Sequence, residues 1–110
     1  HAPPGIPVDI GPGATVAHMC VIHGAHVGAE ALIANHATVL DGAVIGRRSL
    51  VAAHSLVVAG TKIPDEVLVV GSPAKIRGPI AGTGAQTWVD TNPAAYRELG
   101  QRYLTGLGEL

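Results

Sequence analysis

Aliphatic residues recur along the chain with a period that is neither helical nor a simple strand alternation. An α-helix would repeat about every 3.6 residues and a strand every 2 residues. Here the steps are six residues long, except for a five-residue step between Ile22 and Val27. The residue two positions earlier is small throughout the stretch from Val16 to Ile63. The aliphatic positions are Ile10, Val16, Ile22, Val27, Ile33, Val39, Ile45, Val51, Val57, Ile63 and Val69.

A period of six predicts a solenoid built from an internal repeat. Three sides of six residues close one triangular coil, so that the aliphatic residue fills the interior and the small residue lies near the corner. Gly11, Gly28 and Gly46 directly follow an aliphatic position, where a turn with unusual backbone angles favours glycine. We therefore predict an all-β solenoid, a left-handed parallel β-helix of hexapeptide repeats, over residues 1–77.

The segment after the repeats predicts a different structure. Residues 78–91 are typical of a linker. Asn92 is a good N-cap, and Pro93 would occupy the first helical position. We expect a C-terminal α-helix over residues 92–106 that packs on the solenoid. Its apolar side chains recur at helical spacing at Tyr96, Leu99 and Tyr103.

Composition and charge narrow the range of partners. The formal net charge of −1, with no basic run, argues against nucleic acid and against an anionic membrane surface. No apolar run has the length of a membrane-spanning helix. Cys20 is the one cysteine, so neither a disulfide within the chain nor a CxxC pair can form, and we expect a reducing, cytoplasmic compartment. Because the chain begins at His1 without a methionine, we also expect an N-terminally truncated solenoid.

Three of the six histidines interrupt the repeat or precede it. His23 takes the place that glycine fills after other aliphatic residues, His18 lies one position further along its own repeat, and His1 precedes a proline-rich loop. Three neutral imidazoles and a water form an open catalytic zinc site. His18 and His23 can be up to ~16 Å apart along a strand. We therefore expect His1 and His23 from one subunit and His18 from its neighbour to hold the metal.

Several motifs resemble the γ-class carbonic anhydrases. They are TVAHMCVIHG at residues 15–24, VLDGA at 39–43, VGSPAK at 70–75 and the opening HAPPG at 1–5. The Arg, Asp and Gln that stand before the first ligand in that family are absent from this chain. The short stretch between His1 and His18 also leaves no room for the family's acidic loop. The sequence therefore resembles the shorter-loop subgroup.

This resemblance implies a homotrimer with zinc, or alternatively iron or cobalt, held between subunits by His1, His18 and His23. It implies that a metal-bound hydroxide attacks carbon dioxide and that bicarbonate leaves. It also implies that Tyr96 lies near the metal.

Two other functions remain open at this point. Hexapeptide acyltransferases share the solenoid and often end it with a run like Gly71-Ser72-Pro73-Ala74-Lys75, near which coenzyme A binds, and there one histidine would act as a general base without a metal. The third alternative is a non-catalytic trimeric homologue that binds zinc.

The remaining reactive side chains have simpler explanations. His36 and His54 occupy equivalent positions one coil apart and can stack as a column. A second metal there is conceivable, but no third ligand is in register, so we expect ordinary outward-facing or interface histidines. His26 is expected to be solvated and Cys20 to be a buried structural thiol. Asp41 lies at a turn position and is expected to be structural.

Overall fold

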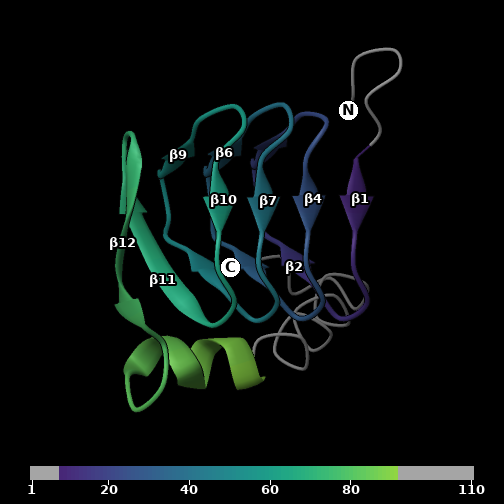
Figure 1. Ribbon diagram of the computed structural model, residues 1–110. Coiled ribbons are helices and arrows are strands. Elements are labelled where there is room, and N and C mark those ends of the chain that lie inside the picture. The colour runs from purple at the N-terminus through teal and green to yellow at the C-terminus, as the bar shows by residue number, and fades with distance from the viewer. Residues whose placement is uncertain (1–7, 92–110) are drawn as a thin grey trace, which may run out of the picture.

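The structure is a computed structural model that describes residues 8–91. Successive short strands face three directions in turn, so that the chain winds into a triangular solenoid (Figure 1). This confirms the predicted all-β solenoid of hexapeptide repeats.

Each side of the solenoid is one sheet whose strands come from successive coils. The first sheet contains β1 (Asp9–Ile10), β4 (His26–Val27), β7 (Val44–Ile45) and β10 (Lys62–Ile63). The second contains β2 (Thr15–Val16), β5 (Leu32–Ile33), β8 (Leu50–Val51), β11 (Val67–Gly71) and β12 (Ala74–Pro79). The third contains β3 (Val21–Ile22), β6 (Thr38–Val39) and β9 (Leu56–Val57).

The strand register explains the five-residue step in the sequence. Ile10 pairs with Val27, and Val27 pairs with Ile45. The first of these pairs joins residues 17 apart and the second joins residues 18 apart. The aliphatic positions therefore stay aligned because the missing residue is taken from the corner between β3 and β4 rather than from a strand.

Burial of the aliphatic positions depends on whether a coil covers them on both sides. Ile45 in β7 and Val51 in β8 are fully buried. Ile10 in β1 and Val16 in β2 occupy the same repeat positions but are 43% and 39% exposed. Both lie in the first described coil, at the end opposite β12 (Figure 1). Interior burial is therefore a property of stacking between coils.

The corners of the solenoid bring backbones very close together. A Cβ on Gly46 would lie 2.4 Å from the carbonyl carbon and oxygen of Pro64, so only glycine fits there. The buried Ser49 hydroxyl donates to the Pro64 carbonyl at 2.5 Å and accepts from the Val67 amide at 3.1 Å. These contacts explain why small residues recur beside the aliphatic ones.

The solenoid ends in an antiparallel hairpin, β11–β12, and a helix follows it. Residues 84–91 are helical, within the segment 78–91 that we expected to be a linker. The Gln86 side chain accepts from the Gly82 amide at 2.8 Å, and the Thr83 hydroxyl donates to the Ile80 carbonyl at 2.6 Å, so both side chains hold the turn that leads into the helix. This local signal places the helix start earlier than the Asn92-Pro93 signal does. The helix expected over 92–106 lies outside the described residues.

The 84–91 helix covers the outer face of the second sheet. Val89 from the helix and Ile80 from the preceding turn are buried against Leu32 and Leu50, which point outward from β5 and β8. The helix crosses one side of the solenoid below its strands (Figure 1). The first and third sheets are thus the sides that this helix leaves uncovered.

Candidate functional site

An exposed histidine–carboxylate pair lies on the first sheet. The backbone register places Asp9 of β1 directly beside His26 of β4. Nδ1 of His26 lies 2.6 Å from Oδ2 of Asp9, and the two side chains are 49% and 67% exposed. His26 is exposed, as expected, and one of its ring nitrogens is in addition engaged by a carboxylate.

This pairing determines what the imidazole can do. An ionised carboxylate is only an acceptor, so Nδ1 carries the proton and donates it to Asp9. The neutral ring then has its lone pair on Nε2. A histidine oriented in this way can take a proton from a substrate group, with the carboxylate stabilising the imidazolium that forms. Asp9 and His26 are thus the described pair best suited to general base chemistry.

The sequence contained a signal for this pair that we did not use. One coil corresponds to 17 residues where it includes the five-residue step, and Asp9 and His26 are 17 residues apart. Both directly precede an aliphatic residue, Ile10 and Val27, and so point outward. The repeat register alone therefore places them side by side.

The stacked histidine column that we predicted is confirmed. The rings of His36 and His54 are parallel to within 5°, with centroids 4.9 Å apart. Both residues lie at turns in one corner of the solenoid and have φ angles of 60° and 61°.

The predicted zinc ligands are described only in part. His18 lies in the turn before β3 and His23 directly follows that strand, so the two flank opposite ends of one side of the coil. His1 and Tyr96 lie outside the described residues. Within residues 8–91, no group of three or more His, Cys, Asp or Glu side chains is arranged to hold a metal ion. The intersubunit zinc site stays a prediction.

Cys20 has the surroundings of a structural thiol. It packs against the aliphatic interior, and its Sγ donates to the carbonyl oxygen of Ala34 at 3.0 Å. Burial raises the pKa of the Cys20 thiol, which disfavours the nucleophilic thiolate.

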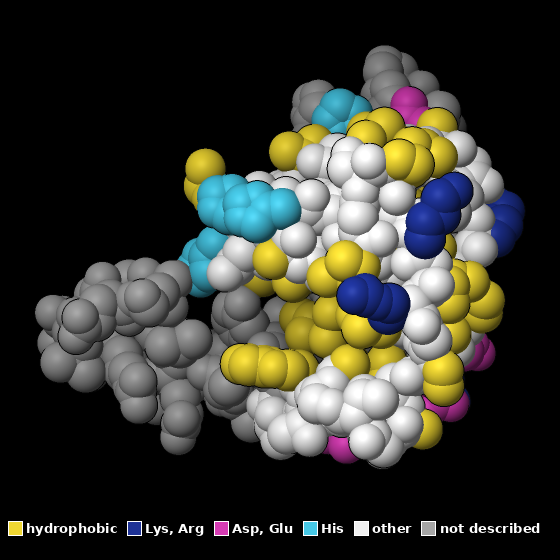
Figure 2. Space-filling view, turned by 90° about the vertical axis from the view of Figure 1, so that its left-hand side faces the viewer, with side chains coloured by type: hydrophobic (Ala, Val, Ile, Leu, Met, Phe, Trp, Pro, Cys, Tyr) yellow, Lys and Arg dark blue, Asp and Glu magenta, His cyan; other side chains and the backbone are white. Residues whose placement is uncertain are grey.

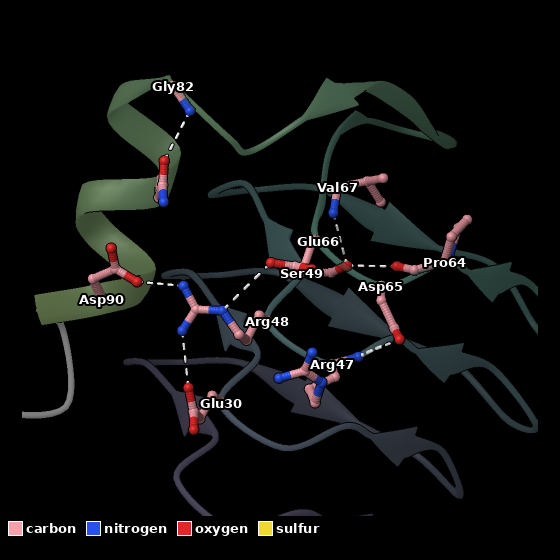
Figure 3. Close-up of polar contacts among 11 residues, drawn as sticks. Glu30, Arg47, Arg48, Ser49, Pro64, Asp65, Glu66, Val67, Gly82 and Asp90 are labelled. Atoms are coloured by element: carbon pink, nitrogen blue, oxygen red, sulfur yellow. Dashed lines mark hydrogen bonds and ion pairs between the residues drawn. The ribbon is translucent and has the colours of Figure 1, made fainter.

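Arg48 joins the helix to the solenoid through three carboxylates (Figure 3). Its Nη1 donates to Glu30 at 2.9 Å, its Nε lies 3.7 Å from Glu66, and its Nη2 donates to Asp90 in the 84–91 helix. Hydrogen bonds to Asp90 and then Glu30 raise the pKa of Arg48. Glu30, Arg48 and Glu66 stack at one corner, and the contact of Arg48 with Asp90 anchors the helix to that corner.

A hollow of about 300 Å³ lies between the solenoid and the 84–91 helix. Figure 2 shows a recess lined by hydrophobic side chains on this face of the molecule. Histidine side chains gather on the same face. The described residues that line the hollow carry no titratable group and include neither Asp9 nor His26. They are Leu32, Ala34, Asn35, Leu50, Ala52, Ala53 and Trp88.

Comparison with known proteins settles the fold. The chain matches no family model. It is similar to a protein of Bacillus cereus with a provisional assignment as an acetyltransferase, at 30% identity and a TM-score of 0.76, over 87% of this chain and 61% of that one. A hexapeptide transferase family protein from Anaplasma phagocytophilum shares the same TM-score and the same coverage at 23% identity. The chain has the left-handed β-helix fold of the hexapeptide-repeat transferases.

A more distant structure has the same fold with its ligands in place. It is a mutant of an N-acyltransferase from Bacillus cereus, bound to coenzyme A and dTDP-4-amino-4,6-dideoxyglucose. It is 13% identical with a TM-score of 0.65, over 84% of this chain and 60% of that one. The chain thus spans about 60% of the length of these solved structures.

These comparisons correct the expected activity. The carbonic anhydrase assignment is wrong, because the 30% identical structure is named as an acetyltransferase and not as a carbonic anhydrase. Carbon dioxide and bicarbonate therefore lose their support as partners. The VGSPAK run resembles both groups of enzymes, so it did not separate the two functions. In the part of the chain that the structure describes, no helix is long and apolar enough to span a membrane.

Proposed function

We propose that this chain is the solenoid of a coenzyme A-dependent acyltransferase and that His26, oriented by Asp9, is its general base. The observation that carries the proposal is the 2.6 Å contact between Nδ1 of His26 and Oδ2 of Asp9, on a fold whose 30% identical relative is assigned as an acetyltransferase. An acyltransferase that works without a metal needs one such histidine as its general base.

The pair would act on the acyl acceptor. Nε2 of His26 accepts the proton that an amine or hydroxyl loses as it attacks the thioester carbonyl, and Asp9 stabilises the resulting imidazolium. The C–S bond then breaks, and Nε2 returns the proton to the departing thiolate. Each proton is accounted for within the pair and the two substrates, so no metal is needed.

Two cations near the end of the solenoid suit the phosphates of coenzyme A. Lys75 and Arg77 are exposed on β12, and neither forms an ion pair with another described residue. Lys and Arg side chains are prominent on the end of the molecule that Figure 2 presents. Unpaired cations bind phosphate without first breaking an internal salt bridge.

We also propose that the active form is a homotrimer. The third sheet is not covered by the helix and exposes Val21, whose side chain is 45% accessible. The first sheet, which carries the half-exposed Asp9–His26 pair, is also left uncovered by the helix, and burying both faces between subunits would remove water from the reaction. Light scattering of the purified protein tests this, with a monomer at micromolar concentration as the contrary result.

The activity is tested by release of free coenzyme A from acetyl-coenzyme A, followed with a thiol reagent over a panel of amine and hydroxyl acceptors. The proposal predicts acceptor-dependent release, and a loss of about 10²-fold to 10⁴-fold in His26→Gln. Lys62→Gln, on the same sheet but two coils away, is the matched control and should retain activity. Full activity in His26→Gln would exclude this histidine as the base.

A further inference from the structure

One corner of the solenoid carries a column of three side chains with metal-binding atoms. Met19, His36 and His54 occupy the same turn position in successive coils. The backbone register is fixed by the His36 amide, which donates to the His18 carbonyl at 2.9 Å, and by the His54 amide, which donates to the Asn35 carbonyl at 3.0 Å. All three are exposed, and they lie away from the Asp9–His26 pair.

The backbone conformation aims these side chains in a common direction. Met19, His36 and His54 have φ angles of 57°, 60° and 61°, all in the left-handed region. Residues other than glycine in this region are uncommon, and a methionine there is more unusual than a histidine. The same conformation recurs at Glu30, Arg48 and Glu66 in another corner, so it belongs to the turn of the repeat and fixes the direction of each side chain. The equal angles also explain why the two imidazole rings stack in parallel.

The two rings are available for a ligand. Within the described part of the chain, neither the His36 ring nor the His54 ring forms a hydrogen bond or an ion pair with another side chain. Neutral imidazole presents one nitrogen lone pair and binds borderline and soft transition metals. Their centroid separation of 4.9 Å is close to the spacing between neighbouring strands, about 4.8 Å.

We propose that Met19, His36 and His54 form a site for cuprous copper, with two imidazole nitrogens and the methionine thioether as ligands. Nitrogen atoms about 2.0 Å from one metal can be at most about 4 Å apart. A metal lies in the plane of each imidazole that binds it, and the planes of two parallel rings do not meet, so the rings have to turn out of their 4.9 Å stack until one nitrogen of each faces a common point. Exposed side chains achieve this by rotation about χ1 and χ2 without moving the backbone.

The thioether selects the metal. Thioethers are soft ligands that favour Cu(I), whereas zinc sites use thiolate, imidazole or carboxylate. Met19 is 75% exposed and has a flexible side chain, so its sulfur can reach over the neighbouring coil. Among residues 8–91, no carboxylate or thiol joins two histidines to complete a conventional zinc set. This column therefore differs in chemistry from the intersubunit site predicted for His1, His18 and His23.

The test is an anaerobic competition for Cu(I) against bicinchoninate, using the full chain. The proposal predicts one Cu(I) bound per chain, with two nitrogen scatterers and one sulfur scatterer in the X-ray absorption spectrum. His36→Asn and His54→Asn should each weaken binding by at least about tenfold, as losses of metal-site residues do. Asparagine tolerates the left-handed conformation, so these variants should fold normally.

Two further variants make the test specific. Met19→Leu should weaken Cu(I) binding while leaving binding of Ni²⁺, which does not need the thioether, unchanged. His26→Asn removes an exposed histidine outside the column and should leave Cu(I) affinity unchanged. Absence of Cu(I) binding, or affinity that is unaffected by Met19→Leu or by either histidine variant, would overturn the proposal.

Discussion

Ile10 and Ile45 offer a direct test of how stacking stabilises this solenoid. They are the same residue type at the same repeat position in the same sheet, in β1 and β7. Ile45 is fully buried between coils, whereas Ile10 is 43% exposed at the end of the stack. Truncating each to alanine therefore changes the same atoms in two different environments.

The expected magnitudes follow from burial. Ile45→Ala removes three methyl or methylene groups at about 0.8 kcal/mol each, and the closed cavity adds to this, so we expect a loss of about 3–4 kcal/mol in the free energy of unfolding. Ile10→Ala removes groups that are already partly hydrated and leaves no closed cavity. We expect a loss of about 1 kcal/mol there.

Urea unfolding followed by circular dichroism measures both changes. Ile45→Val is the graded control and should cost about 0.5–1.5 kcal/mol. Equal losses for Ile10→Ala and Ile45→Ala would refute the reasoning, because the two positions would then be equally buried in solution.

Further predictions concern a close approach, a thiol and a charge cluster. Gly46→Ala should destabilise the fold by about 3 kcal/mol or more, because the new Cβ meets backbone, whereas Gly60→Ala has open space and should cost about 1 kcal/mol through its φ of 76°; thermal unfolding compares the two. Burial raises the pKa of Cys20, so iodoacetamide should alkylate it more slowly in the native protein than in urea. The same shift means that its contribution to stability is present below the unfolded pKa of about 8.5 and is lost as the pH rises through the folded value. Arg48→Met should lower stability by about 1 kcal/mol at low salt, since it leaves neighbouring carboxylates unpaired, and by less in 1 M salt; a loss that is independent of salt would contradict this.

The sequence predicted the periodic part of the molecule well, because every coil repeats the same steric requirement. The interior position of Ile45 and the stacking of His36 on His54 both follow from counting repeats. Asp9 beside His26 was predictable in principle from the same register, but only once the five-residue step is assigned to a corner.

Contacts between the solenoid and the helix could not be predicted by counting repeats. The Arg48–Asp90 contact depends on how the 84–91 helix lies on the second sheet, and no periodicity carries that information. The choice between carbonic anhydrase and acyltransferase failed for a related reason. The VGSPAK run and the repeats serve the shared solenoid, and a shared fold does not determine the reaction.

The central claim is that Asp9 and His26 act together as the general base of acyl transfer. A double-mutant cycle on acceptor-dependent release of coenzyme A tests it most directly, with Asp9→Asn, His26→Gln and the double variant compared at saturating substrates. We predict that Asp9→Asn lowers kcat in the native background and has little further effect once His26 is replaced, because a positioning carboxylate acts through its histidine. Equal effects of Asp9→Asn in both backgrounds, or no acceptor-dependent release at all, would contradict the account.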